Sequence, residues 1–123
     1  RLCYAQDVSA VTGACLMVKK SIYEEVGGLD ETFEVSLNDV DFCLKCREKS
    51  YLNVFTPFAE LYHYESASRG SDVTDASSDN AKRYDRESEH FRTKWKEILE
   101  KGDPYYNPNF TLDRSDYSLK VQD

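Results

Sequence analysis

Short apolar runs along the chain have the lengths and residue types of β-strands. Residues 8–18 are small, β-branched and apolar, which predicts a buried strand interrupted at Gly13. A glycine inside a strand often marks the close approach of a backbone or a ligand. Residues 51–56 predict a second short strand that stops at Pro57, and the alternation over residues 59–64 suggests a third.

Helix signals lie between and after these runs. Ser21 is a good N-cap, and Glu24 completes a capping box three residues later. The pair Gly27-Gly28 predicts the end of this short helix, because glycine supplies the positive φ that helix C-termini favour.

A second helix is predicted over residues 36–50. Ser36 or Asn38 can cap it. Asp39 and Asp41 then fall in its first turn, where the helix macrodipole favours negative charge. Being two residues apart, these carboxylates point in different directions and are not expected to form a shared dyad.

The C-terminal part of the chain is more polar. Residues 65–80 are rich in serine and aspartate and predict a mobile loop. Residues 81–101 predict a strongly charged helix with apolar side chains at helical spacing, ended by Gly102. Residues 105–123 show no clear periodicity.

Composition narrows the classes of protein. The 123 residues are 40% hydrophobic and carry a net charge of −7, which suits one domain with a core and excludes the basic footprint of a nucleic-acid binder. The chain starts at Arg1 and its one methionine is Met17, so we expect a processed product or a piece of a longer protein.

The four cysteines predict a reducing setting. Cys15 lies in an apolar run, and Cys43 and Cys46 lie in the body of a predicted helix, where free cysteine behaves as a buried hydrophobe. A redox pair normally lies at a helix N-terminus, and a zinc site needs a second ligand pair that the sequence lacks. Buried reduced cysteines imply a reducing, cytoplasmic setting; the fourth cysteine is Cys3.

Four blocks, in the same order, resemble the C-terminal half of family 2 glycosyltransferases, in particular the bacterial rhamnosyltransferase-like branch of cell-surface polysaccharide synthesis. The blocks are TGACLMVKK (12–20), EVGGLDETF (25–33), NDVDFCLK (38–45) and PFAELYHYES (57–66). Residues 102–110 also resemble the tails of many of these proteins.

The resemblance implies an α/β chain that is the C-terminal portion of a GT-A fold, with few short strands flanked by helices. Residues 1–70 would form the C-terminal half of the catalytic domain, with the acceptor and base region. Residues 71–123 would form a mobile loop, the charged helix and a C-terminal extension. The implied reaction is inverting transfer from a nucleotide-sugar donor to a glycan or lipid-linked acceptor. The donor half with its Asp-x-Asp motif is missing, so the chain alone is expected to be inactive.

The resemblance also assigns the candidate acidic residues. Asp39 matches the catalytic base of the family, although Asn38 stands where the family usually has glutamate. Asp41 matches a second, commonly acidic position, and we place it among the substrate-binding residues. A carboxylate can take the proton that the acceptor hydroxyl loses as it attacks the anomeric carbon.

Four more residues complete the predicted site. Gly13 and Ala14 leave space for a sugar or the acceptor, and Arg69 falls in a segment that closes over the donor diphosphate. His63 matches a histidine that binds the divalent metal in related enzymes. Taken singly, His63 has the ordinary interpretation of a hydrogen-bonded histidine, and Arg69 that of a solvated cation. The metal, Mn²⁺ or Mg²⁺, is expected only together with the missing N-terminal half.

Partners and alternatives follow from the same analysis. No nucleic acid is expected, and peripheral association of the parent with the inner face of the membrane is left open. Half a sheet would expose strand edges and apolar surface, which predicts self-association. The alternative is a non-enzymatic α/β module that binds a protein partner. A sugar hydrolase is less favoured, because it needs two carboxylates facing one bond.

Overall fold

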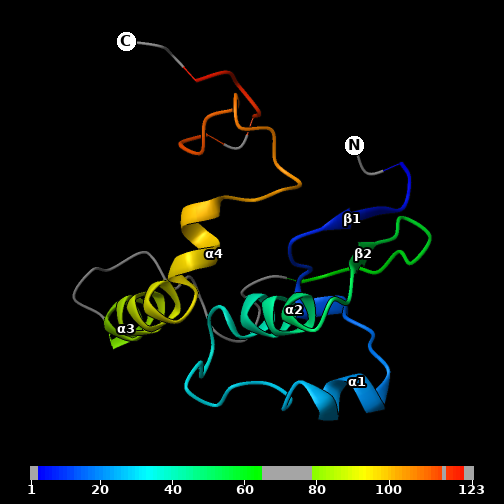
Figure 1. Ribbon diagram of the computed structural model, residues 1–123, viewed down its shortest axis with the longest axis vertical. Coiled ribbons are helices and arrows are strands. Elements are labelled where there is room, and N and C mark those ends of the chain that lie inside the picture. Colours follow the sequence, from blue (N-terminus) through cyan, green and yellow to red (C-terminus); the bar gives the residue numbers. More distant parts are fainter. Residues whose placement is uncertain (1–2, 65–78, 115, 121–123) are drawn as a thin grey trace.

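The computed structural model describes residues 3–64, 79–114 and 116–120. Within them the chain is a mixed α/β protein, as predicted. Its elements are β1 (Gln6–Val8), the 3-10 helix η1 (Gly13–Cys15), α1 (Lys20–Glu25), α2 (Asn38–Glu48), β2 (Asn53–Phe55), α3 (Asp79–Lys94) and α4 (Lys96–Lys101). Helix α2 lies at the centre, with the two strands and α1 on one side and α3 and α4 on the other (Figure 1).

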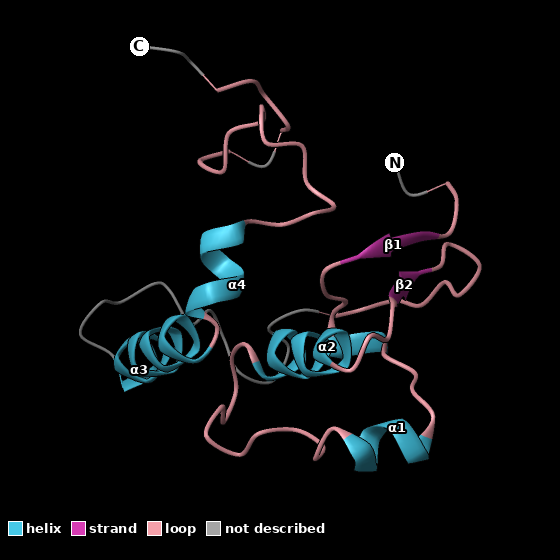
Figure 2. Cartoon of the chain, viewed as in Figure 1, coloured by secondary structure: helices cyan, strands magenta, loops and turns pink. Residues whose placement is uncertain are grey.

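The sheet is a short antiparallel pair, with Gln6 opposite Phe55 and Val8 opposite Asn53. The strand predicted over residues 51–56 is confirmed. The third strand, suggested over residues 59–64, is not formed: this segment is drawn as loop in Figure 2.

The long strand predicted over residues 8–18 is wrong beyond Val8, because the following backbone finds partners outside a sheet. Val11 donates its N–H to the Cys43 sulfur at 3.5 Å. Thr12 caps the 3-10 helix by accepting the N–H of Ala14. These side-chain acceptors take the place of a neighbouring strand, and the chain turns at Gly13.

Both early helices form, but their caps differ from those predicted. Ser21 lies inside α1, whose N-cap is Lys19 with no side-chain cap bond. Gly27 and Gly28 have φ values of 79° and 67°, which confirms the predicted helix end. The N-cap of α2 is Leu37, so neither Ser36 nor Asn38 caps it, while two aspartates do occupy its first turn.

The charged helix predicted over residues 81–101 is two helices, α3 and α4, that meet at Trp95. Trp95 is buried, and its indole N–H donates to Asp41 of α2, so a tertiary contact accompanies the break. Gly102 ends α4 with φ 77°, as predicted. The predicted loop lies outside the described residues except for its last two positions, which begin α3.

The core lies between α2 and α3. Its buried members come from the loop before α2 and from both helices: Phe33, Leu44, Phe91 and Trp95, with Leu37, Val40 and Ile98 packed against them. The core therefore uses residues from both sides of the predicted division at residues 70 and 71. That division itself stays a prediction.

The cysteines are free and divide into two environments. Cys43 and Cys46 are buried in α2, and burial raises the pKa of both thiols. The predicted burial of Cys15 is wrong: it is exposed, because it lies in the 3-10 turn and not in a strand, and Cys3 is exposed as well. None of the helices in the described part of the chain is long and apolar enough to cross a membrane.

Candidate functional site

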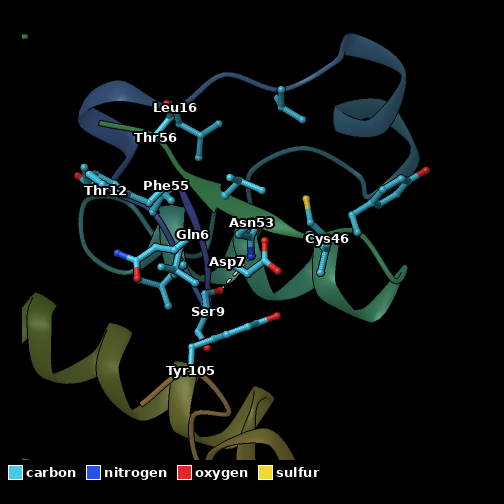
Figure 3. Close-up of a pocket in the computed structure, with 18 of the residues that line it drawn as sticks. Gln6, Asp7, Ser9, Thr12, Leu16, Cys46, Asn53, Phe55, Thr56 and Tyr105 are labelled. Carbon is cyan, nitrogen blue, oxygen red and sulfur yellow. Dashed lines mark hydrogen bonds between the residues drawn. The ribbon is translucent and has the colours of Figure 1, made fainter. Parts of the chain in front are cut away.

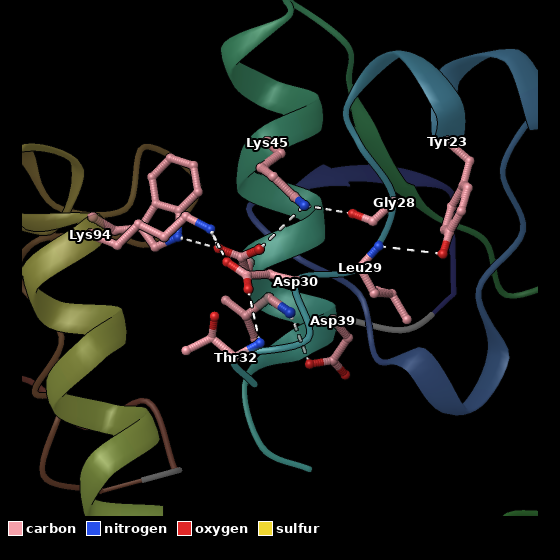
Figure 4. Close-up of polar contacts among 11 residues, drawn as sticks. Tyr23, Gly28, Leu29, Asp30, Thr32, Asp39, Lys45 and Lys94 are labelled. Atoms are coloured by element: carbon pink, nitrogen blue, oxygen red, sulfur yellow. Dashed lines mark hydrogen bonds and ion pairs between the residues drawn. The ribbon is translucent and has the colours of Figure 1, made fainter. Parts of the chain in front are cut away.

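The candidate base, Asp39, is the second residue of α2 and is held by two backbone N–H groups. Its Oδ2 accepts the N–H of Gly13 at 2.7 Å, and its Oδ1 accepts the N–H of Val40 at 2.8 Å. The residue is half-buried. Since each carboxylate oxygen can accept more than one hydrogen bond, both oxygens keep acceptor capacity for a further donor. Figure 4 shows Asp39 beside the polar contacts that surround it.

Gly13 is brought directly against Asp39, although 26 residues separate them. A Cβ added at Gly13 would lie 3.2 Å from the Asp39 Cβ and 3.5 Å from its Oδ2. That spacing is tight for a side chain, so glycine allows the backbone of the 3-10 turn to reach the carboxylate. Ala14, the next candidate residue, is exposed in the same turn. The structure thus joins Gly13 to Asp39 and leaves Ala14 beside Gly13 in the same turn.

The backbone is strained at Leu37, two residues before the candidate base Asp39. Leu37 has φ 65° and ψ 1°, a left-handed conformation that costs a non-glycine residue about 1 kcal/mol. Its carbonyl accepts the N–H of Asp41 at 2.8 Å and so starts α2. Such residues cluster at functional sites, where the surrounding structure holds them. No residue type at this position signalled the strain in advance.

Asp41 lies in a different environment from Asp39. It is fully buried, and its Oδ1 accepts the Trp95 indole N–H at 2.8 Å and pairs with the Lys94 ammonium at 2.7 Å. The Lys45 ammonium is 3.6 Å from its other oxygen. The structure therefore gives Asp41 protein partners on α2 and α3. Its assignment to substrate binding stays a prediction.

Lys94 links three parts of the molecule. Besides Asp41 it contacts Asp30, in the loop after α1, at 2.7 Å. The hydrogen bond from Lys94, helped by Thr32, holds the pKa of Asp30 well below its ordinary value. Burial disfavours the Lys94 ammonium, but its hydrogen bonds to the two aspartates outweigh this and raise the Lys94 pKa. Sequence reasoning missed this cluster (Figure 4), because its members are distant along the chain.

The predicted metal ligand is not part of a complete metal site. His63 lies in an exposed segment that follows β2. Among residues 3–64, 79–114 and 116–120, no group of three or more His, Cys, Asp and Glu side chains could hold a metal ion. The residues that the structure describes therefore do not fit a divalent metal on their own. Arg69 lies outside the described residues.

A groove of about 1200 Å³ lies along the sheet side of α2. Both strands line it, together with aromatic side chains of the C-terminal segment such as Tyr105 (Figure 3). Its lining also includes Thr12 and Val40, the chain neighbours of Gly13 and Asp39. The volume is of the order of ligand-binding clefts. Gly13 and Asp39 themselves are not among the residues that line the groove, although each has a chain neighbour that does.

Comparisons with known proteins find three relatives that differ in how much they share. The chain is 47% identical over 120 residues to the uncharacterised protein y4gI of Sinorhizobium fredii, which is 97% of the chain and 13% of that protein. It is 35% identical over 111 residues to the O-antigen biosynthesis protein RfbC of Myxococcus xanthus, covering 90% of the chain and 8% of that protein.

The third relative is the N-acetylglucosaminyl-diphospho-decaprenol L-rhamnosyltransferase of Mycobacterium tuberculosis, 35% identical over 67 residues, with 54% of the chain and 22% of that protein covered. The chain spans less than a quarter of each of these relatives. No protein-family model and no solved structure matches it. The matches point to a glycosyltransferase-like family, which supports the resemblance of the four blocks at that coarser level.

Proposed function

We propose that this chain is the base-bearing part of a family 2 glycosyltransferase with a GT-A fold. The sugar would pass from a nucleotide-sugar donor to a glycan or lipid-linked acceptor in cell-surface polysaccharide synthesis. The observation that carries the proposal is the Asp39 carboxylate, half-buried at the start of α2 and held by the Gly13 N–H at 2.7 Å. The relatives' names support the reaction class, and the decaprenol-linked substrate in one name supports a lipid-linked acceptor.

In the proposed reaction Asp39 acts as general base. The acceptor hydroxyl transfers its proton to the carboxylate while its oxygen forms a bond to the anomeric carbon of the donor. The bond from that carbon to the diphosphate oxygen breaks, and the nucleoside diphosphate leaves with the electron pair. Attack from the face opposite the leaving group inverts the anomeric centre. The N–H groups of Gly13 and Val40 hold the carboxylate in one orientation during the transfer.

Groups other than Asp39, Gly13 and Val40 must stabilise the leaving diphosphate. Charge that develops on a leaving group calls for cations or a metal ion, and the described residues do not fit a metal by themselves. His63 could contribute one ligand to a Mn²⁺ or Mg²⁺ site completed by residues of a donor-binding half. Each relative is more than twice as long as this chain, and we therefore propose that the isolated chain does not transfer sugar.

The test is Asp39→Asn in the protein at its natural length, with release of nucleoside diphosphate measured across a panel of nucleotide-sugars. Removing a general base is expected to lower the rate by about a hundredfold or more. Asp85→Asn removes the same charge from an exposed position of α3 and is expected to leave the rate within about twofold. Undiminished transfer by the Asp39 variant would contradict the proposal. A protein-interaction module would show no transfer with any donor.

A further inference from the structure

Helix α3 holds the backbone that leads into Asp39. Glu87 of α3 is 4% exposed, and its carboxylate accepts three consecutive backbone N–H groups. One oxygen accepts from Glu34 at 3.0 Å and from Val35 at 3.3 Å, and the other accepts from Ser36 at 2.7 Å. Successive N–H groups that converge on one anion form a nest, which sets the conformation of the loop that supplies them.

This nest lies immediately before the strained start of α2. Ser36 is followed by Leu37 in its left-handed conformation, and Asp39 comes two residues later. A strained residue keeps its conformation only when its surroundings hold it. The three charge-assisted hydrogen bonds from residues 34–36 to Glu87 stabilise the backbone just before Leu37 in this way. Arg83, one turn earlier on α3, lies 3.9 Å from the Glu87 carboxylate and partly balances its charge.

A second contact from the same helix holds the other side of Asp39. Lys94 pairs with Asp41 at 2.7 Å, and Trp95, which directly follows α3, donates to the same oxygen at 2.8 Å. The segment between residues 36 and 41 is therefore held at both ends by one helix. Between these ends Leu37 and Val40 pack against the core, and the Asp39 carboxylate accepts the N–H of Gly13.

We propose that Glu87 is a positioning residue for Asp39, a role that rests on the proposed function. Docking of α3 does not require it, since Phe91 and Trp95 already pack against Phe33 and Leu44 in the core. Burying a carboxylate also carries a desolvation penalty that an apolar side chain at this place would avoid. The hydrogen bonds to Glu87 fix the loop at residues 34–36 in one conformation. Because this loop leads into α2, they also fix the orientation of the first turn of α2.

Glu87→Gln tests this role in the protein at its natural length, with Glu89→Gln as the matched control. Glu89 is exposed on the same helix, two residues further on. Glutamine has an NH₂ group in place of one carboxylate oxygen. This group cannot accept a backbone N–H, so the loop loses part of its hydrogen bonding. We expect kcat to fall by about tenfold to a hundredfold, as misplacement of a reacting group does, with KM for the donor within about twofold. The control is expected to change neither.

The double variant Asp39→Asn/Glu87→Gln separates positioning from general destabilisation. If Glu87 acts through Asp39, the double variant is no slower than Asp39→Asn alone. An equal further loss from Glu87→Gln in both backgrounds would overturn the positioning role. Full activity of Asp39→Asn would instead remove the proposed function, which is a different outcome and is read from that single variant.

Hydrogen exchange gives a readout that needs no activity and serves if one variant folds poorly. In Glu87→Gln, and more weakly in Glu87→Asp, peptides covering residues 34–36 and residues 11–15 are expected to exchange faster than in the unmodified protein. The second peptide contains the Gly13 N–H that bonds Asp39. Unchanged exchange at residues 11–15 in both variants would overturn the proposal, because the loop would then not be coupled to the base.

Discussion

The two sides of α2 are built differently. Toward α3 the contacts are dense: Phe33, Leu44 and Trp95 are each at most 4% exposed, and the buried Asp41 is paired. Toward the sheet, Phe42 and Cys46 of α2 are also buried, but they line a groove of about 1200 Å³, and Phe58 after β2 is 86% exposed. In the described part of the protein, side chains therefore pack on both sides of α2, and the groove lies on the sheet side.

Asp39 lies between these two sides, and its contacts bear on the base role proposed for it. A catalytic carboxylate must be fixed in direction yet remain within reach of a substrate. The N–H groups of Gly13 and Val40 supply the fixing contacts, and the residue is only half-buried, so part of its surface stays accessible. Asp41, only two residues away, has the first property without the second.

Replacing a phenylalanine with alanine on each side of α2 gives the largest expected difference in unfolding free energy. Phe33→Ala removes a buried ring that contacts the rings of Phe91 and His90, and it should lower the free energy of unfolding by about 3–5 kcal/mol. Phe58→Ala removes an exposed ring and should change it by less than about 0.5 kcal/mol. Urea unfolding of both variants measures the difference, and similar losses would contradict the division into two sides.

Removing the buried carboxylate tests the polar part of the packed side. Asp41→Ala leaves the Trp95 indole N–H and the ammonium groups of Lys45 and Lys94 short of a partner, and it should destabilise the chain by about 3 kcal/mol. Thermal or urea unfolding provides the value. Asp85→Ala, on the exposed face of α3, is the matched control and should have almost no effect. Equal effects would show that the cluster around Asp41 contributes little.

A smaller effect is expected where the packed side meets the groove. Gly13→Ala would bring a methyl group 3.2 Å from the Asp39 Cβ, so the turn or the carboxylate must shift by a few tenths of an ångström. We expect a loss of about 1 kcal/mol or less in unfolding free energy, together with reduced transfer by the protein at its natural length. Ala5→Ser alters an exposed residue outside the predicted site and should change neither quantity. Full transfer by Gly13→Ala would show that the close approach is dispensable.

The smallest effect is a dependence of stability on acid pH. Lys94 holds the pKa of Asp30 below its ordinary value of 3.8, so in acid the unfolded chain binds more protons at this residue than the folded chain. The stability that Asp30 contributes is therefore present above pH 3.8 and is lost as pH falls further. Asp30→Asn should flatten this fall in unfolding free energy, measured by urea unfolding at several pH values. If the unfolding free energy falls equally with pH in both proteins, Asp30 does not contribute to the loss of stability in acid.

Local patterns predicted several elements correctly because their causes are local. Helical spacing of apolar side chains and the first-turn aspartates marked α2, and Gly27, Gly28 and Gly102 marked helix ends through their positive φ. The strand predicted over residues 8–18 failed because its hydrogen-bond partners lie elsewhere in the chain. The same holds at Trp95, where the helix breaks beside a bond to Asp41 that no spacing in the sequence could reveal.

The sequence by itself determined the mixed α/β class, the helix that is α2, and the candidates Gly13, Ala14 and Asp39. Only the tertiary structure decided that Gly13 donates to Asp39, that Asp41 turns into the core, and that Glu87 holds the loop before the base. The physical reason is the range of the interactions. Turn and helix preferences act over a few residues, whereas these hydrogen bonds join groups 26 to 54 positions apart, and nothing in a local pattern records such a partner.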